Sequence, residues 1–144
     1  MLRLSRELHD QMIAHAYVGL PLEACGLFAG DPGADADRSG EDCAAVVRHF
    51  YPTENEAKSS KVYTVPGKAF LHADRDAEDR GWQLLGVMHS HTHTDAYPSP
   101  TDVAQAPDPA WHYVIVSMRD DLPSLRSYRI VDGEITEEPV VLGD

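Results

Sequence analysis

Residues 86–102, GVMHSHTHTDAYPSPTD, contain the change in residue type that decides the fold. An apolar run continues to Met88, and polar residues replace it abruptly from His89 onward. A short apolar run with such a boundary is typical of a buried strand that ends at the edge of a sheet. Further along, residues 99–102 (SPTD) predict the start of a helix, with serine at the N-cap and proline at the first helical position. The stretch therefore predicts a strand, a loop and a short helix.

Two histidines at the end of this strand are spaced to bind a metal ion. His89 and His91 are two residues apart, so both imidazoles point to the same face of the strand. Zinc commonly binds histidine nitrogen and carboxylate oxygen, and a catalytic zinc keeps three protein ligands and one open position. Asp102 is the third predicted ligand, because a carboxylate in the first turn of the helix can face the strand end. A capping box with Ser99 also explains this aspartate, and the two interpretations are compatible.

The spacing of these residues resembles the signature of the JAMM (MPN+) zinc metallopeptidases. That signature is an upstream glutamate, then H-[ST]-H, seven residues and SxxD, and it is matched here by Glu23, residues 89–91 and residues 99–102. The resemblance implies an α/β fold, a single JAMM/MPN domain with a mixed β-sheet flanked by helices, as in the cytidine-deaminase-like architecture. It also implies one Zn²⁺ per chain, held by the two histidines and Asp102.

The resemblance further implies a catalytic role for several side chains. Zinc lowers the pKa of its bound water to about 7 and polarises the scissile carbonyl group. Glu23 is expected to take the proton from that water and to pass it to the leaving amine. Ser99 is expected to donate a hydrogen bond to the developing oxyanion, in addition to its capping role. His93 continues the alternation of histidines, but the signature does not require it, and a fourth protein ligand would exclude the water.

The resemblance extends along the chain to the short actinobacterial branch of the family. The segments 91–102, 111–120 (WHYVIVSMRD) and 125–140 (LRSYRIVDGEITEEPV) support it. The implied reaction is cleavage of the amide bond after the C-terminal glycine of a ubiquitin-like sulfur-carrier protein, which releases cysteine for cysteine biosynthesis. The predicted partner is a carrier with a Gly-Gly C-terminal tail. Asn55 and Ser59 are predicted tail contacts, because their segment resembles the part of the family beside the catalytic groove, where a tail can add as a strand.

Three other functions remain open. The same chemistry could act on another ubiquitin-like conjugate, such as a protein isopeptide. The domain could be a non-catalytic MPN scaffold, although such members typically lack ligands of the motif. The histidine-rich tract could bind a metal through His89, His91 and His93 alone, which would require neither Glu23 nor Asp102. Zinc nucleobase deaminases are disfavoured, because their H-x-E and P-C-x-x-C signatures are missing.

Outside residues 86–102, the pattern of apolar and polar residues predicts helices and strands that alternate in one mixed α/β domain. Apolar residues at four-residue intervals predict a helix over 4–20 with Ser5 as its N-cap, and a proline-initiated amphipathic pattern predicts a second helix over 66–81. The polar segment 31–42 predicts an exposed loop, and the Asp132–Gly133 pair predicts a hairpin turn. Strands are predicted over residues 24–30, 44–51, 61–65, 83–90, 111–118 and 125–131, and after the hairpin turn.

Length and composition restrict the partners and the compartment. A chain of 144 residues fits one domain, 1–144. Its 12 Lys+Arg and 24 Asp+Glu give a net charge of −12, which disfavours nucleic acid and anionic membranes as partners. Cys25 and Cys43 are too few for a disulfide framework and are predicted to be reduced, with Cys25 buried. The sequence has no membrane-spanning run and no signal-peptide pattern, so the expected location is the cytoplasm.

Overall fold

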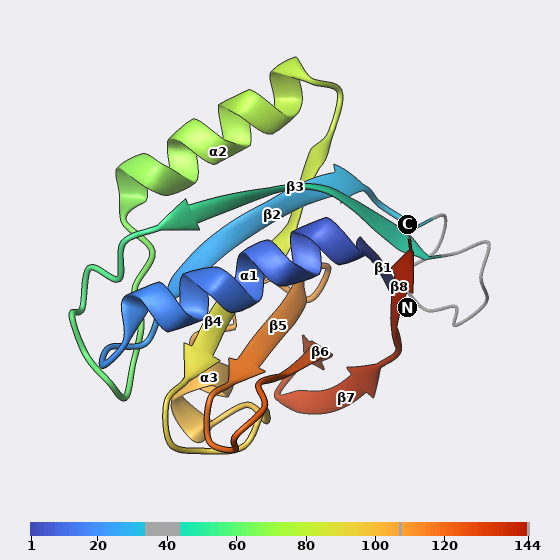
Figure 1. Cartoon of the computed structure of the whole chain (residues 1–144). Helices are drawn as coiled ribbons and strands as arrows, with labels where there is room; N and C mark the ends of the chain where they lie inside the picture. The colour runs from blue at the N-terminus through green and yellow to red at the C-terminus, as the bar shows by residue number, and fades with distance from the viewer. Residues whose placement is uncertain (34–43, 107, 144) are drawn as a thin grey trace.

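Eight strands form one mixed β-sheet in the computed structural model, which describes residues 1–33, 44–106 and 108–143. The strand order is β7-β6-β5-β4-β2-β3-β1-β8, and β4 lies near the middle, antiparallel to β2 and parallel to β5 (Figure 1). This arrangement confirms the predicted mixed sheet flanked by helices. The elements in chain order are β1 (Leu2–Ser5), α1 (Arg6–Gly19), β2 (Cys25–Asp31), β3 (Ala45–Thr53), α2 (Gly67–Asp79), β4 (Gln83–His91), α3 (Pro100–Ala104), β5 (His112–Ser117), β6 (Ser124–Val131), β7 (Glu134–Glu138) and β8 (Val140–Gly143).

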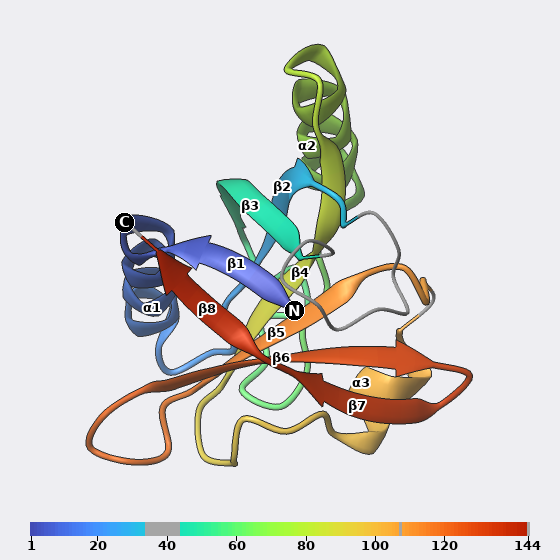
Figure 2. The same cartoon turned by 90° about the vertical axis from the view of Figure 1, so that its right-hand side faces the viewer.

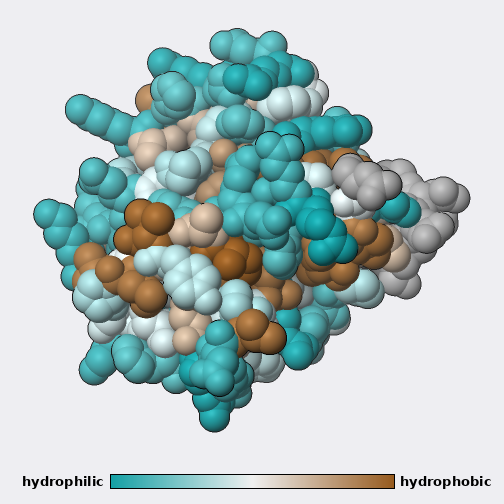
Figure 3. Space-filling model, in the orientation of Figure 1, coloured by the Kyte–Doolittle hydropathy of each residue, from teal (hydrophilic) through white to brown (hydrophobic). Residues whose placement is uncertain are grey.

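The helix α1 covers one face of the sheet. It buries Leu8, Met12 and Ala16 in a cluster that also contains Phe28 of β2 and Met88 of β4. Its opposite side faces solvent, and apolar side chains interrupt the hydrophilic surface on the face that carries this helix (Figure 3). Within the described residues, no helix combines the length and the apolar character needed to cross a membrane.

The opposite face of the sheet carries α2 and the candidate site. There α2 buries Ala73 against Leu27 of β2 and Val87 of β4. Since side chains of a strand alternate between faces, His89 and His91 lie on the same face as Val87. Gly86 lets β4 approach β5 closely, because a Cβ atom at this position would lie 1.9 Å from a backbone oxygen of β5. The central strand is therefore held tightly on both sides up to the point where the histidines begin.

The first and last strands are the main departure from the sequence-based expectations. Residues 2–5 form β1, so that Leu4 and Ser5, the first residues of the predicted helix 4–20, belong to a strand. β1 pairs in parallel with β8 at the edge of the sheet, where the two termini also lie (Figure 2). The helix itself begins after Ser5, whose side chain accepts a hydrogen bond from Leu8 N at 3.1 Å, so the predicted N-cap is confirmed. Pro139 separates β7 from β8, whereas one strand was expected there.

The segment 61–65 was wrongly predicted to be a strand. It joins no ladder, because side-chain and loop contacts within residues 55–64 satisfy part of its backbone instead. Pro66 occupies the N-cap of α2 rather than its first helical position. The hairpin turn is confirmed, with positive φ values of 51° at Asp132 and 80° at Gly133. The predictions for Cys43 and for most of the 31–42 loop fall outside the described residues.

A buried carboxylate, Glu138, joins the last strands to the centre of the sheet. Its Oε2 lies 2.5 Å from His112 Nδ1 of β5 and accepts a hydrogen bond from Ser127 Oγ of β6 at 2.8 Å. Burial by itself raises the pKa of Glu138, but these contacts outweigh burial and lower the pKa to about 2. Because this is below the ordinary value, the ionised carboxylate stabilises the fold above about pH 5, and the stabilisation is lost as the pH falls through the folded-state pKa.

Glu138→Gln is expected to lower the free energy of unfolding at pH 7 by about 2–3 kcal/mol. The difference between wild type and variant should shrink steadily as the pH is lowered from about 5 toward 3, and urea denaturation at a series of pH values measures it. The matched control is Glu137→Gln, which removes an exposed ion pair with Arg126 and should change stability by less than about 1 kcal/mol. A difference that does not depend on pH would contradict the assignment.

Candidate metal centre

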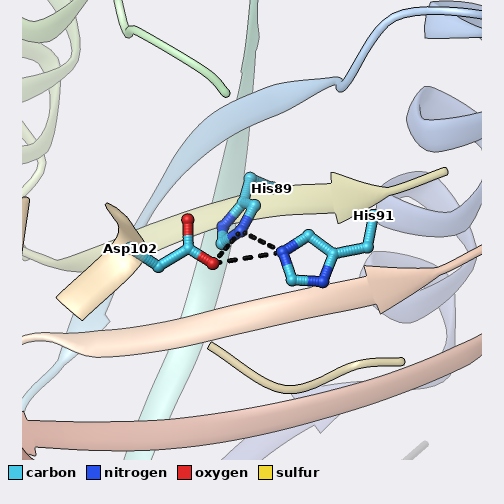
Figure 4. A group of neighbouring side chains, drawn as sticks. All are labelled: His89, His91 and Asp102. Carbon is cyan, nitrogen blue, oxygen red and sulfur yellow. Dashed lines mark hydrogen bonds and ion pairs between the residues drawn. The ribbon is translucent and has the colours of Figure 1, made fainter. Parts of the chain in front are cut away.

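Three side chains from two elements converge on one point. His89 and His91 extend from the end of β4, and Asp102 extends from the first turn of α3 (Figure 4). The two Nε2 atoms are 3.1 Å apart, and Asp102 Oδ2 lies 3.2 Å from His89 Nε2 and 3.1 Å from His91 Nε2. All three residues are largely buried, with exposed fractions of 1%, 4% and 9%. The predicted ligand residues are thus brought together in space.

Local structure explains how the sequence produces this convergence. In the ladder, His89 pairs with Cys25 of β2 and with Ile115 of β5, which fixes the position of its backbone. Ser99 caps α3 in a reciprocal capping box: its Oγ accepts from Asp102 N at 3.1 Å, and its backbone N–H donates to Asp102 Oδ2 at 2.8 Å. The same carboxylate oxygen therefore caps the helix and faces both histidines, so the two interpretations of Asp102 hold together.

The protonation pattern of the histidines fits a bound cation. His91 Nδ1 lies 2.8 Å from the Asp95 carbonyl oxygen, which can only accept, so Nδ1 carries the proton of the neutral ring and Nε2 presents its lone pair to the centre. Two ring nitrogens and a carboxylate oxygen then face one another with too few protons for three hydrogen bonds. Ligands of a tetrahedral zinc ion, at about 2.0–2.1 Å, lie roughly 3.3 Å apart, close to the spacing found here. The donor set therefore fits a divalent metal ion.

Burial and the mutual contacts set the charges of these groups. Burial lowers the pKa of His89, so its ring is neutral at physiological pH. Burial by itself raises the pKa of Asp102, but the contacts with His89 and His91 lower it well below its ordinary range. Burial by itself lowers the pKa of His91, but its contacts with Asp102 and with the Asp95 carbonyl oxygen raise it. The site thus holds an ionised carboxylate beside the neutral ring of His89, and ligation of a metal requires His91 to present its Nε2 without a proton.

Glu23 lies beside this centre, just before β2. Only 5% of its surface is exposed, and its Oε1 is buried without a hydrogen-bond partner among the described residues. Burial raises the pKa of Glu23 to about 7, with His91 lowering it and Asp102 raising it further. These interactions place the carboxyl group within electrostatic reach of the predicted ligands. A carboxylate with a pKa near neutrality is suited to accept and return a proton.

The other predicted site residues lie in different surroundings. Asn55 directs its amide to backbone groups of its own loop and of Glu23, so the geometry does not support it as a tail contact. Ser59 Oγ accepts from two backbone N–H groups of the same loop and keeps its own hydroxyl proton. His93 is exposed and contacts Thr92 Oγ1 at 2.7 Å, apart from the three converging residues.

Ser90 and Cys25 lie close to the centre in the sheet, and both make structural contacts. Ser90 is fully buried and points away from the histidines, where its Oγ accepts from Ala24 N at 2.8 Å, as its alternation in the strand predicts. Cys25 is buried, and its thiol contacts Thr53 Oγ1 and the Glu54 carbonyl oxygen. Burial raises the pKa of this thiol, which favours its protonated form and does not favour a nucleophilic role.

Tyr63 is the contact that the sequence-based reasoning missed. Its ring stacks on the ring of His89, with the centroids 4.3 Å apart and an interplanar angle of 17°. The same tyrosine borders an apolar cavity of about 330 Å³ on this face of the sheet, whose floor includes Leu27 and Val87. Tyr63 therefore lies between this cavity and the ring of His89. No spacing rule points to Tyr63, because residues 61–65 carry only a weak alternation.

The sequence and the fold are similar to those of known proteins. The family model described as prokaryotic homologs of the JAB domain matches residues 5–131. The chain is 43% identical over 141 residues to a CysO-cysteine peptidase of Mycobacterium tuberculosis, covering 97% of this chain and 90% of that protein. It is 30% identical over 121 residues to a desampylase of Haloferax volcanii, covering 81% and 80% of the two chains. A solution structure of a protein from Desulfitobacterium hafniense superposes with a TM-score of 0.86 at 32% identity, covering 100% of this chain and 94% of that one.

Proposed function

We propose that this chain, which belongs to the prokaryotic JAB-domain family and is a hydrolase of the peptidase type, releases cysteine from the C-terminal glycine of a ubiquitin-like sulfur-carrier protein. The observation that carries the proposal is the buried Glu23 carboxyl group beside the converging His89, His91 and Asp102, with one oxygen that has no hydrogen-bond partner in the described part of the chain. The similarity to a CysO-cysteine peptidase over nearly the whole chain supports the choice of substrate. We further propose that residues 1–144 form one domain and act in the cytoplasm.

In the proposed reaction, the chain's own residues hold the cofactor and move one proton. His89, His91 and Asp102 would hold one zinc ion, which would supply a more acidic water molecule and a polarised scissile carbonyl group. Glu23 accepts a proton from the attacking water and delivers it to the nitrogen of the departing cysteine. The bond between water oxygen and carbonyl carbon forms, and the carbon–nitrogen bond breaks. The products are the carrier with a free C-terminal carboxylate and a cysteine with a free amino group.

In the proposed mechanism, Ser99 serves both the helix and the reaction. Its Oγ uses a lone pair to accept from Asp102 N, so its hydroxyl proton is available for a hydrogen bond to the developing oxyanion. Such a bond strengthens as negative charge develops on the carbonyl oxygen, and this is how a donor of this kind lowers the barrier.

Ser99→Ala is therefore expected to lower kcat by about 10²–10³-fold and to cost about 1 kcal/mol of stability through the lost cap. The backbone N–H of residue 99 still holds Asp102, so zinc content should not change. Ser5→Ala is the matched control, because it removes the side-chain cap of α1, and it should lose similar stability without loss of kcat. Steady-state kinetics and thermal unfolding separate the two effects. Equal kcat values in the two variants would show that Ser99 acts only as a cap.

A second candidate substrate is an isopeptide conjugate of a ubiquitin-like protein. The desampylase relative favours it, although at lower identity than the CysO-cysteine peptidase. The reacting bond is again an amide after a terminal glycine, so the catalytic residues would serve both reactions. The two candidates differ only in the group attached to the glycine.

The test compares the two candidates directly with zinc-loaded protein. One substrate is a Gly-Gly-ended carrier that bears a C-terminal cysteine, and the other is the same carrier joined to a lysine side chain. Intact mass spectrometry follows both, with a chelator as control. Loss of one cysteine residue at a higher kcat/KM than lysine release is expected. Preferential lysine release would favour the isopeptide function, and loss of neither group would refute both.

A further inference from the structure

Asn55 uses all the hydrogen-bonding capacity of its side chain inside the chain. Its Nδ2 donates to three backbone oxygens, and its Oδ1 accepts from two backbone N–H groups. The partners are Glu23 O at 3.0 Å, Val62 O at 3.0 Å, Ser59 O at 3.3 Å, Ala57 N at 3.0 Å and Thr64 N at 3.0 Å. Because an amide offers two hydrogens and two lone pairs, no donor or acceptor is left for a substrate.

The bond to Glu23 matters because this residue lies outside the sheet. The pairing of β2 with its neighbours begins at Cys25, so the ladder does not hold the backbone of Glu23. Its N–H donates to Ser59 O at 2.9 Å, and its carbonyl oxygen accepts from Asn55. The loop that Asn55 organises therefore satisfies both backbone groups of Glu23. Among the described contacts, Asn55 supplies the side-chain bond to the carbonyl oxygen of Glu23, and Ser90 Oγ accepts from the N–H of the following residue, Ala24.

We propose that Asn55 is a positioning residue, which fixes the backbone of Glu23 so that the Glu23 carboxylate meets the reacting water in the correct place. The proposal rests on the function proposed above, and it replaces the expectation that Asn55 contacts the carrier tail. A proton acceptor must lie within about 2.6–3.2 Å of its donor, so a small displacement is costly. A misplacement of about 1 Å can reduce a rate by roughly 10²-fold.

Asn55→Asp tests this role. Aspartate keeps an oxygen to accept from Ala57 and Thr64, but it replaces the donor to Glu23, Ser59 and Val62 with a second acceptor. The expected result is a fall in kcat of about 10–100-fold, with KM within about threefold of wild type. Zinc content measured by atomic emission should stay at one per chain. Should this variant fail to fold, Asn55→Gln keeps the amide but displaces it by one methylene, and the same pattern is expected.

Two further variants control the interpretation. Ala57→Asp places the same added charge two residues away on an exposed position without removing the Asn55 donor, and its kcat should match wild type within about twofold. The double variant Glu23→Gln/Asn55→Asp tests whether the two residues act together. If Asn55 works only through Glu23, the residual rate of Glu23→Gln should not fall further when Asn55→Asp is added.

The outcomes separate this proposal from the proposed function. A lower kcat with unchanged KM, seen only when Glu23 is present, supports the positioning role. A raised KM with normal kcat overturns it and returns Asn55 to substrate contact. An equal loss of kcat with and without Glu23, or no loss, also overturns it. If Glu23→Gln alone leaves the rate unchanged, the proposed role of Glu23 fails first, and that single variant identifies this case.

Discussion

Glu23→Gln is expected to lower the rate of hydrolysis by about 10²–10⁴-fold while the metal stays bound. Glutamine has nearly the same shape as glutamate, so the packing before β2 is retained. It cannot accept a proton from water, however, and it cannot deliver one to a leaving amine. Steady-state kinetics on the carrier substrate measure the loss, and metal content per chain measures what remains in the site.

Metal retention is the more informative half of this experiment. Glu23 is not among the three residues whose ligand atoms converge, and its Oε1 is free of partners among the described residues. A proton acceptor needs such a free oxygen, whereas a ligand would lie within the convergent group. Loss of zinc in Glu23→Gln would show that Glu23 is a ligand and would require a different base.

A matched control removes the same charge outside the site. Glu56 is exposed and lies in the loop next to Asn55. Glu56→Gln should keep kcat within about twofold of wild type, because exposed charges in water interact weakly with a buried site. Comparable losses in both variants would indicate that the total charge of this region matters, rather than the proton acceptor at position 23.

The centre was predictable because its signals are local. The positions of His89, His91 and Asp102 depend on one strand end and one capped turn, and both can be recognised from neighbouring residues. Glu23 is different, because only the pairing of β2 with β4 brings it to the histidines. No periodicity in the sequence indicates that pairing, so its prediction came from family resemblance.

The errors in the predicted fold have a physical cause in long-range contacts. Leu2 and Leu4 fit either the start of a helix or a short strand, and β1 exists because it pairs with β3 and β8. The residue types of 61–65 favour a strand although their alternation is weak, but Asn55 supplies hydrogen bonds that a neighbouring strand would otherwise provide. When a side chain makes the hydrogen bonds that a neighbouring strand would otherwise make, the sequence of the bonded segment does not indicate it. The stacking of Tyr63 on His89 was missed for the same reason.

Asp102→Asn is expected to weaken zinc binding by more than about 100-fold and to remove hydrolysis. Mutation of residues that only contact metal ligands typically weakens metal binding by about 10–100-fold, and loss of a ligand should have a larger effect. Asparagine can still accept from Ser99 N, so the cap of α3 is retained in part. It lacks the negative charge that balances a divalent ion in this buried place. Calorimetric titration with zinc gives the affinity, and mass spectrometry of the carrier gives the activity.

Thermal unfolding supplies an independent measure of the same binding. A ligand that binds only the folded state stabilises it by about 2.7 kcal/mol at one hundred times its Kd. Zinc should therefore raise the Tm of wild type and leave that of Asp102→Asn nearly unchanged. Asp31→Asn makes the same chemical change in an exposed ion pair with Arg48, and it should keep the full response to zinc.

The result also decides between the two ways in which the histidine-rich tract could bind a metal. If Asp102→Asn bound zinc with wild-type affinity, the third ligand would have to come from elsewhere, and His93 is the nearest candidate in the sequence. His93→Ala would then lose zinc. The geometry leads to the opposite expectation, since His93 is exposed and contacts Thr92, whereas Asp102 Oδ2 lies within 3.2 Å of both convergent nitrogens. His93→Ala should therefore keep both zinc and activity, because the charge and position of Asp102 complete the site.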